Sequence, residues 1–110
     1  MSDFEIVRLK AEYNDIFTSL DFKRISESKL YETYVNKDKL QIDVDFRYDN
    51  ARFSVGCYHE YSQNQYDTID RDFDSLEEML SFLDEYDSSL SAKITAALRK
   101  MKLERIAAVS

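Results

Sequence analysis

Residues 40–61 read LQIDVDFRYDNARFSVGCYHEY, and no other segment of the chain constrains its own geometry so tightly. Apolar residues occupy every even position of 40–48 and, after Asp49 and Asn50, every odd position of 51–57. An apolar residue at every second position is typical of a strand with one buried face. A two-residue turn at Asp49 and Asn50 explains the change of parity, and both residue types tolerate the backbone conformation of such a turn. The segment therefore predicts an antiparallel hairpin.

The predicted turn also determines which residues of the hairpin face each other. If the turn consists of Asp49 and Asn50, every opposing pair is apolar. The pairs are Tyr48 and Ala51, Phe46 and Phe53, Val44 and Val55, and Ile42 and Cys57. Opposing residues on one face contact each other directly, so we expect all of these side chains to join the core. The polar residues of the hairpin then form its other face, which no predicted element is available to cover.

The segments before and after the hairpin predict a helix and further strands. Residues 2–20 carry apolar residues at helical spacing, and Ser2 and Glu5 have the spacing of a capping box. Residues 22–35 are rich in β-branched and aromatic residues, which favours one bent strand or two short ones. A weak alternation over 66–73 indicates a fourth strand at the edge of the sheet.

Two helices are predicted at the C-terminal end. Ser75 and Glu78 form a second capping box at the start of a helix over about 75–87, and a break at 87–89 precedes a last helix. The predicted fold class is α+β, with an N-terminal helix, an antiparallel meander of three or four strands, and two C-terminal helices packed on one face of the sheet. A chain of 110 residues allows one domain over 1–110.

Composition predicts a cytoplasmic protein. There is no run of about 18 apolar residues, and the N-terminus lacks a basic region followed by an apolar one, so neither a membrane span nor a signal peptide is expected. Cys57 is the only cysteine, which agrees with a reducing compartment.

The net charge of −7 is unevenly distributed along the chain. Residues 61–87 contain nine acidic residues and one basic residue. An acidic surface attracts basic partners, and tyrosine beside carboxylates suits an interface. We therefore expect a small acidic binding protein that inhibits or neutralises a basic protein partner, as an immunity protein or a nuclease inhibitor does. The candidate partner-binding residues are Asp43, Asp45, Tyr58, Tyr66, Asp67, Asp70, Asp72, Asp74, Glu77 and Glu78.

The sequence lacks a recognisable catalytic set. Cys57 and His59 would stand about 6–7 Å apart on a strand, which is too far for the hydrogen bond of a catalytic pair. Aligning the acidic run with a calcium-binding loop puts Ser75 at the glycine position and Ser81 at the position of the bidentate glutamate. We therefore predict no enzymatic activity, no metal and no cofactor. A metal-dependent enzyme based on the carboxylates is a minor alternative.

The main alternative to an inhibitor is a structural module that forms a homodimer through the open sheet face or the last helix. Nucleic acid is not expected as a partner, although the last helix is basic. Its basic residues are Lys93, Arg99, Lys100, Lys102 and Arg105. They are more readily explained as a counterbalance to the acidic region, because the whole chain is acidic.

Overall fold

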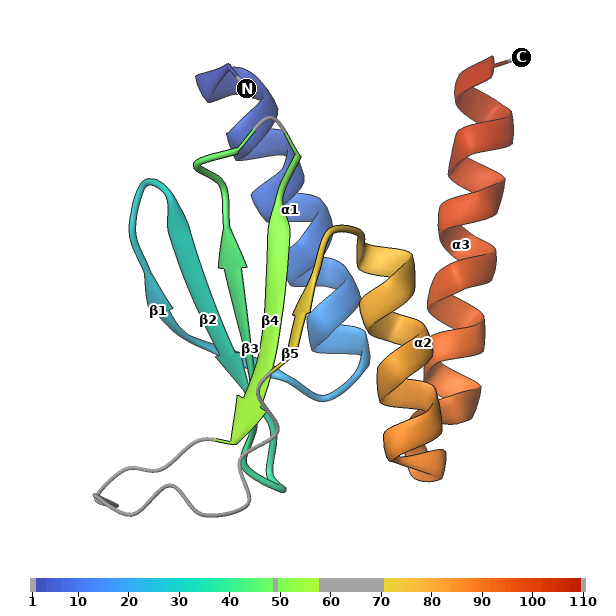
Figure 1. Cartoon of the computed structure of the whole chain (residues 1–110). Helices are drawn as coiled ribbons and strands as arrows, with labels where there is room; N and C mark the ends of the chain where they lie inside the picture. The colour runs from blue at the N-terminus through green and yellow to red at the C-terminus, as the bar shows by residue number, and fades with distance from the viewer. Residues whose placement is uncertain (1, 49, 58–70, 110) are drawn as a thin grey trace.

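The computed structural model describes residues 2–48, 50–57 and 71–109 (Figure 1). In chain order the elements are α1 (Asp3–Ser19), β1 (Lys23–Glu27), β2 (Tyr31–Val35), β3 (Leu40–Asp45), β4 (Arg52–Cys57), β5 (Arg71–Phe73), α2 (Leu76–Tyr86), the 3₁₀ helix η1 (Ser88–Leu90) and α3 (Ser91–Val109). This order confirms the predicted α+β fold. The described part of the chain contains five strands instead of three or four, because residues 22–35 form two strands and the edge strand is present.

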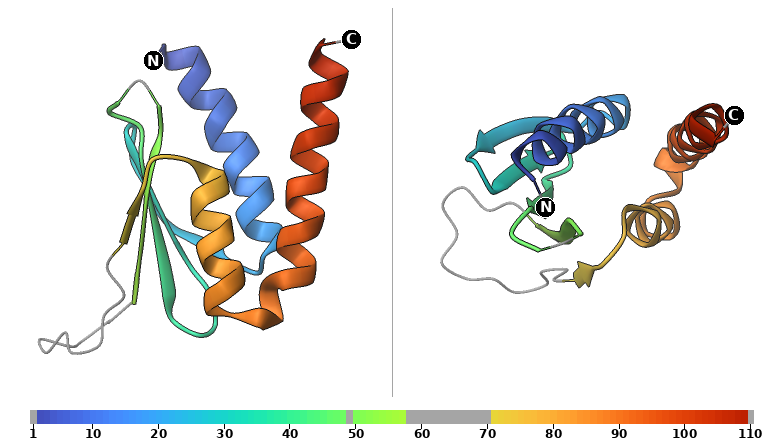
Figure 2. Two further views of the ribbon diagram at one scale, coloured as in Figure 1. Left: turned by 45° about the vertical axis from the view of Figure 1, so that its right-hand side comes forward. Right: turned by 90° about the horizontal axis from the view of Figure 1, so that it is seen from above.

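The five strands form one antiparallel sheet in the order β1-β2-β3-β4-β5. All three α-helices lie on the same side of this sheet (Figure 2). Helices α1 and α2 are next to the sheet, and α3 packs on α1 and α2. The other face of the sheet therefore has no helix of the described chain against it, as the sequence predicted.

Both predicted N-caps are confirmed. The hydroxyl oxygen of Ser2 accepts a hydrogen bond from the Glu5 N–H at 3.2 Å, and that of Ser75 accepts from the Glu78 N–H at 3.2 Å. Each bond satisfies an N–H that has no partner within its helix. Helices α1 and α2 therefore begin where short local signals place them.

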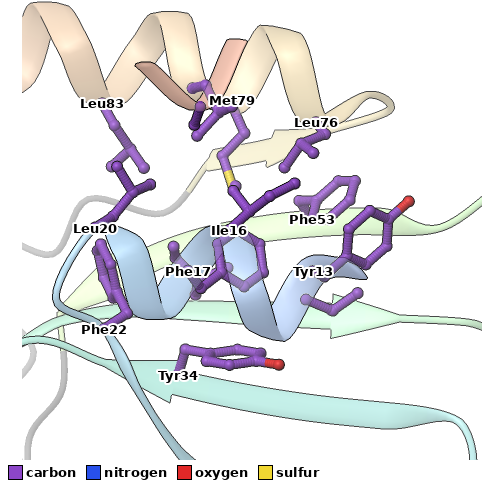
Figure 3. Packing of buried hydrophobic residues seen from close by; sticks show 14 of the residues in the cluster. Tyr13, Ile16, Phe17, Leu20, Phe22, Tyr34, Phe53, Leu76, Met79 and Leu83 are labelled. Carbon is purple, nitrogen blue, oxygen red and sulfur yellow. The ribbon is translucent and has the colours of Figure 1, made fainter. Parts of the chain in front are cut away.

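The core lies between the sheet and helices α1 and α2 (Figure 3). Period-two residues of the strands and helically spaced residues of the helices meet there, as their patterns predict. The buried members include Tyr13, Ile16, Phe17, Leu20, Tyr34, Ile42, Val44, Phe53, Val55, Leu76, Met79, Leu80 and Leu83.

The hairpin forms, but its predicted register is wrong by two residues. Val44 lies opposite Phe53 instead of opposite Val55. The chain turns earlier because the Asp45 carboxylate accepts a hydrogen bond from the Arg47 N–H at 2.9 Å, a bend to which aspartate is suited. A shift of two residues keeps the parity, so the apolar residues of β3 and β4 still share one face.

Tyr48 shows the consequence of this shift. It lies in the loop between β3 and β4 with 41% of its surface exposed, so its predicted place in the core is wrong. The guanidinium carbon of Arg52 lies 4.0 Å from the centre of the Tyr48 ring. The ring therefore packs on a cation at the surface.

Residues 22–35 form two strands, with a bulge in the first. The register of β1 against β2 shifts between Arg24 and Ser26, and β1 is an edge strand. On β2, the helix-facing residues include one carboxylate, Glu32, which is 1% exposed. Arg24 reaches it from β1, with its Nη1 atom 2.8 Å from Glu32 Oε2.

The helices of residues 2–48 and 71–109 include none that combines the length and the apolar character needed to span a membrane.

The buried Tyr13 predicts a specific loss of stability at alkaline pH. Burial, followed by the charges of Glu12 and Glu77, raises the pKa of Tyr13 from 10.0 to about 12, although Arg8 lowers it. The folded state thus favours the neutral phenol, and the resulting stabilisation is lost as the pH rises from the unfolded pKa towards the folded one. Urea titrations should show that Tyr13→Phe loses less stability than the parent chain between pH 9 and pH 11, by on the order of 1 kcal/mol.

Equal pH slopes in the two proteins would contradict this assignment. Phe4→Leu is the control, because it changes an exposed aromatic residue of the same helix that carries no ionisable group. This variant should follow the pH dependence of the parent chain.

Candidate partner-binding surface

The sheet face that points away from the helices, called the open face from here on, is the candidate surface for a partner. Its side chains alternate along each strand with those of the core. None of the described helices covers it (Figure 2). Its central polar residues are Thr33, Gln41, Asp43, Asp45, Ser54 and Asp72.

One row of this face crosses four strands. Thr33 lies opposite Asp43, Asp43 opposite Ser54, and Ser54 opposite Asp72. Thr33 Oγ1 donates to Asp43 Oδ1 at 2.8 Å, and Ser54 Oγ donates to Asp72 Oδ1 at 2.7 Å. The two carboxylates thus stand on either side of Ser54. From the spacing of neighbouring strands they are roughly 9–10 Å apart, so each can engage a separate group of a partner.

The charges of these two carboxylates are not balanced by a cation of the described chain. The side-chain amide of Gln41 donates to both oxygens of Asp43, at 3.0 and 2.9 Å. This amide and the hydroxyls of Thr33 and Ser54 are all uncharged hydrogen-bond donors. Neutral donors orient a carboxylate but leave its negative charge available, so this row can accept positively charged groups.

The next row is different, because its carboxylate is paired. Asp45 lies between Tyr31 and Arg52 and accepts from Arg47, with Nη2 at 2.9 Å and Nε at 3.1 Å. Burial raises the pKa of Asp45, but the hydrogen bonds from Arg47 lower it more, so that it lies below its ordinary value. Asp45 therefore remains ionised and positions the Arg47 guanidinium.

Two tyrosines complete this end of the open face. The guanidinium carbon of Arg47 lies 4.9 Å from the centre of the Tyr31 ring, and Arg52 stacks on Tyr48. Both rings are about two-fifths exposed. Rings and guanidinium groups in such contact form a surface with large contact area and polar edges.

The other predicted acidic residues do not gather on the open face. Asp74 follows β5 at its edge, 3.8 Å from Arg52 Nε. Glu77 lines a cavity beside α1, and it also lines, together with Glu78 and Arg71, a depression between β5 and α2. The acidic segment thus divides between two sides of the molecule, because the chain crosses from the sheet to the helical layer between β5 and α2. Tyr58, Tyr66, Asp67 and Asp70 lie outside the described residues.

Three residues of this surface were not among the predicted ones. Thr33 donates to the Asp43 carboxylate, and Tyr31 and Tyr48 stack on arginines. The polar parity of β3 and β4 already placed Gln41 and Ser54 on the same face as Asp43. Only the true register brings Tyr31, Asp45 and Arg52 into one row, so this group could not be found from residue spacing alone.

No group of three or more His, Cys, Asp or Glu side chains within residues 2–48, 50–57 and 71–109 is arranged to hold a metal ion.

Comparison with family models, curated proteins and solved structures found no match to this chain.

Proposed function

We propose that this chain is a non-enzymatic protein that binds and neutralises a basic protein partner through the open face. The observation that carries the proposal is the pair of carboxylates, Asp43 and Asp72, on either side of Ser54. Their described hydrogen bonds come from neutral donors. Lysine or arginine side chains of a partner would supply the balancing charge in hydrogen bonds that are stronger than neutral ones.

The distribution of charge supports an electrostatic mode of recognition. The net charge of −7 attracts a basic molecule over a distance and raises the rate of association. Nucleases and other proteins that act on nucleic acids present basic surfaces to phosphate groups. A row of carboxylates on a sheet face would occupy such a surface, which is the mode of action of an inhibitor or immunity protein.

The end of the open face where Asp45 pairs with Arg47 also supports the proposal, because it can provide selectivity. Tyrosine and arginine dominate the binding energy of many interfaces, and here Tyr31, Tyr48, Arg47 and Arg52 lie together. We infer that the carboxylate row provides attraction, whereas this stacked group selects among basic partners by shape. The single cysteine, Cys57, fits action in a reducing compartment such as the cytoplasm.

The test is the effect of neutral isosteres on binding. Proteins captured from the native cells on the immobilised chain would be identified and purified, and their association measured by surface plasmon resonance between 50 and 500 mM salt. Asp43→Asn and Asp72→Asn keep an oxygen that can accept from Thr33 or Ser54 but remove the charge. We expect each to weaken binding by about three- to tenfold, mainly through slower association, and to reduce the dependence on salt.

Asp38→Asn is the matched control, since it removes one charge in the turn between β2 and β3. It should bind like the parent chain. Binding that does not respond to salt, or that is weakened equally by Asp38→Asn, would show that the open face is not the interface. If the captured protein is this chain itself, and light scattering finds a dimer at micromolar concentration, the homodimer alternative replaces the proposal.

A further inference from the structure

Aromatic rings and guanidinium groups alternate at the end of the open face. The guanidinium carbon of Arg47 lies 4.9 Å from the centre of the Tyr31 ring and 5.8 Å from that of the Tyr48 ring. The guanidinium carbon of Arg52 lies 4.0 Å from the centre of the same Tyr48 ring. The four side chains therefore form one series, which begins with the Tyr31 ring and ends on the guanidinium group of Arg52.

Arg52 has the chemistry to extend this series by one more ring. A guanidinium group is planar and weakly hydrated, and its two faces can stack on aromatic rings. Among the described residues, only the Tyr48 ring stacks on Arg52 and only Asp74 pairs with its charge, with Oδ1 lying 3.8 Å from Arg52 Nε. The Arg52 side chain is 54% exposed. A second ring can therefore reach it from solvent.

A depression of about 380 Å³ lies beside this guanidinium group. It is lined by Tyr48, Asn50, Arg52 and Asp74. A cavity of about 150 Å³ is enough to hold benzene, so the depression has room for one aromatic side chain. Arg52 and Asp74 carry opposite charges, and the other two lining residues are uncharged. The depression is neutral in sum and suits a neutral ring.

The polar lining residues determine which aromatic side chain fits best. The Asp74 carboxylate is 87% exposed and can accept a hydrogen bond, whereas the Asn50 amide can both donate and accept. A phenol hydroxyl also donates and accepts, so it can bond to both groups. The indole of tryptophan only donates, and phenylalanine has no polar atom. Tyrosine therefore matches this lining best.

The contacts around Arg52 hold the stack together before a ligand binds. Asp45 accepts from Arg47 Nε at 3.1 Å and from Nη2 at 2.9 Å, and Arg47 in turn contacts the Tyr48 ring. A site whose side chains are already ordered loses less conformational entropy on binding. Pockets of this kind, filled by one aromatic residue of a partner, contribute much of the binding energy of protein interfaces.

We propose that this depression binds one tyrosine side chain of the protein partner, with the ring stacked on the Arg52 guanidinium and the hydroxyl donating to Asp74. The inference rests on the proposed function for the existence of the partner, and adds that the partner presents a tyrosine beside its basic residues. The carboxylates of the open face then speed association, and the tyrosine slows dissociation.

NMR titration of the ¹⁵N-labelled chain, without any partner, tests the site. The probes are the N-acetyl amides of tyrosine, phenylalanine and leucine, which differ only in the side chain. We expect the tyrosine probe to shift the N–H signals of Arg52 and Asn50 to saturation, with a Kd on the order of a few millimolar. The phenylalanine probe should bind about two- to fivefold more weakly, because it lacks the hydroxyl. The leucine probe should not saturate these signals.

Two variants locate the ring and its hydroxyl. Arg52→Gln removes the guanidinium group and should weaken binding of the tyrosine probe about two- to fivefold. Asp74→Ala should lower the affinity for the tyrosine probe to that for the phenylalanine probe, and leave the latter unchanged. Arg71→Gln is the matched control, because Arg71 lies 5.4 Å from the Phe82 ring centre in the separate depression between β5 and α2. It should leave both affinities unchanged.

Three results would each overturn the proposal. They are the absence of a saturable shift with the tyrosine probe, equal affinity for the leucine probe, and equal weakening by Arg52→Gln and Arg71→Gln. Equal affinities for the tyrosine and phenylalanine probes would overturn the assignment of a tyrosine. Thermal melts establish that the variants are folded, and if Arg52→Gln is not, Asp74→Ala decides the outcome with the same probes.

These measurements are independent of the test of the proposed function. They use the chain alone and neutral probes, so a failure here leaves the recognition of a basic partner by Asp43 and Asp72 in place. Asp43→Asn and Asp72→Asn should not change the affinity for the tyrosine probe. If these two variants instead leave partner binding unchanged, the proposed function fails while the probe titrations stand.

Discussion

Replacing Phe17 with alanine should lower the free energy of unfolding by about 3–5 kcal/mol, the usual cost of removing a buried aromatic ring. Phe17 has no exposed surface, and its ring centre lies 4.8 Å from that of Tyr34 in an edge-to-face contact. It also contacts the rings of Tyr13 and Phe53. The residue therefore joins α1 to two strands of the sheet, and a cavity in its place cannot be filled by one neighbour. Urea denaturation monitored by circular dichroism measures the loss.

Phe4→Ala is the matched control on the same helix. Phe4 is 79% exposed, so its removal should change the stability by less than about 0.5 kcal/mol. A similar loss in both variants would mean that α1 contributes through helix formation alone and not through its packing on the sheet.

The elements of this fold follow from local patterns. Helix α1 has a buried stripe at helical spacing and an N-cap at Ser2, and β3 and β4 have buried residues at every second position. These signals depend on neighbours in sequence, so one chain is sufficient to detect them. The register of the hairpin does not follow in the same way. Two registers that differ by two residues place identical faces in the core, and the hydrogen bond that the Arg47 N–H donates to the Asp45 carboxylate decides between them.

The candidate surface was less predictable than the fold. A count of charges along the chain groups Asp72 with Glu77, but the chain passes from the sheet to the helical layer between them. The count also separates Asp43 from Asp72, although both flank Ser54. A surface is defined by which strands are neighbours, and strand order depends on contacts that are distant in sequence.

Glu32 illustrates the same difficulty within the core. Its position in the alternation of β2 places it on the helix-facing side with Tyr34, where a carboxylate is not expected. It is tolerated because the Arg24 guanidinium reaches it and the Tyr34 hydroxyl donates to it at 3.3 Å. The bulge in β1 lies directly after Arg24. The sequence alone does not reveal that Arg24 and Tyr34 contact Glu32, because the Arg24 contact depends on the register of β1 against β2.

The pair of Arg24 and Glu32 gives the second large effect that we expect. Arg24→Met retains an unbranched stem but leaves the fully buried Glu32 carboxylate without its cation. Breaking a buried pair in this way costs about 3–5 kcal/mol, and we expect the lower end of this range because the Arg24 side chain is partly exposed. Glu32→Gln should cost less, since the remaining Arg24 can turn towards Glu27, 3.5 Å away, and towards water. Urea titrations of both single variants provide the comparison.

The double variant Arg24→Met and Glu32→Gln separates the loss of the charge pair from the loss of packing. The glutamine that replaces Glu32 in this variant is neutral and keeps an oxygen that can accept a hydrogen bond from Tyr34, so no buried charge is left uncompensated. It should therefore be more stable than Arg24→Met alone, and the effects of the two substitutions should not be additive. If the double variant loses the sum of the two single effects, Glu32 does not depend on Arg24. The ion pair would then be a surface contact that the core does not require.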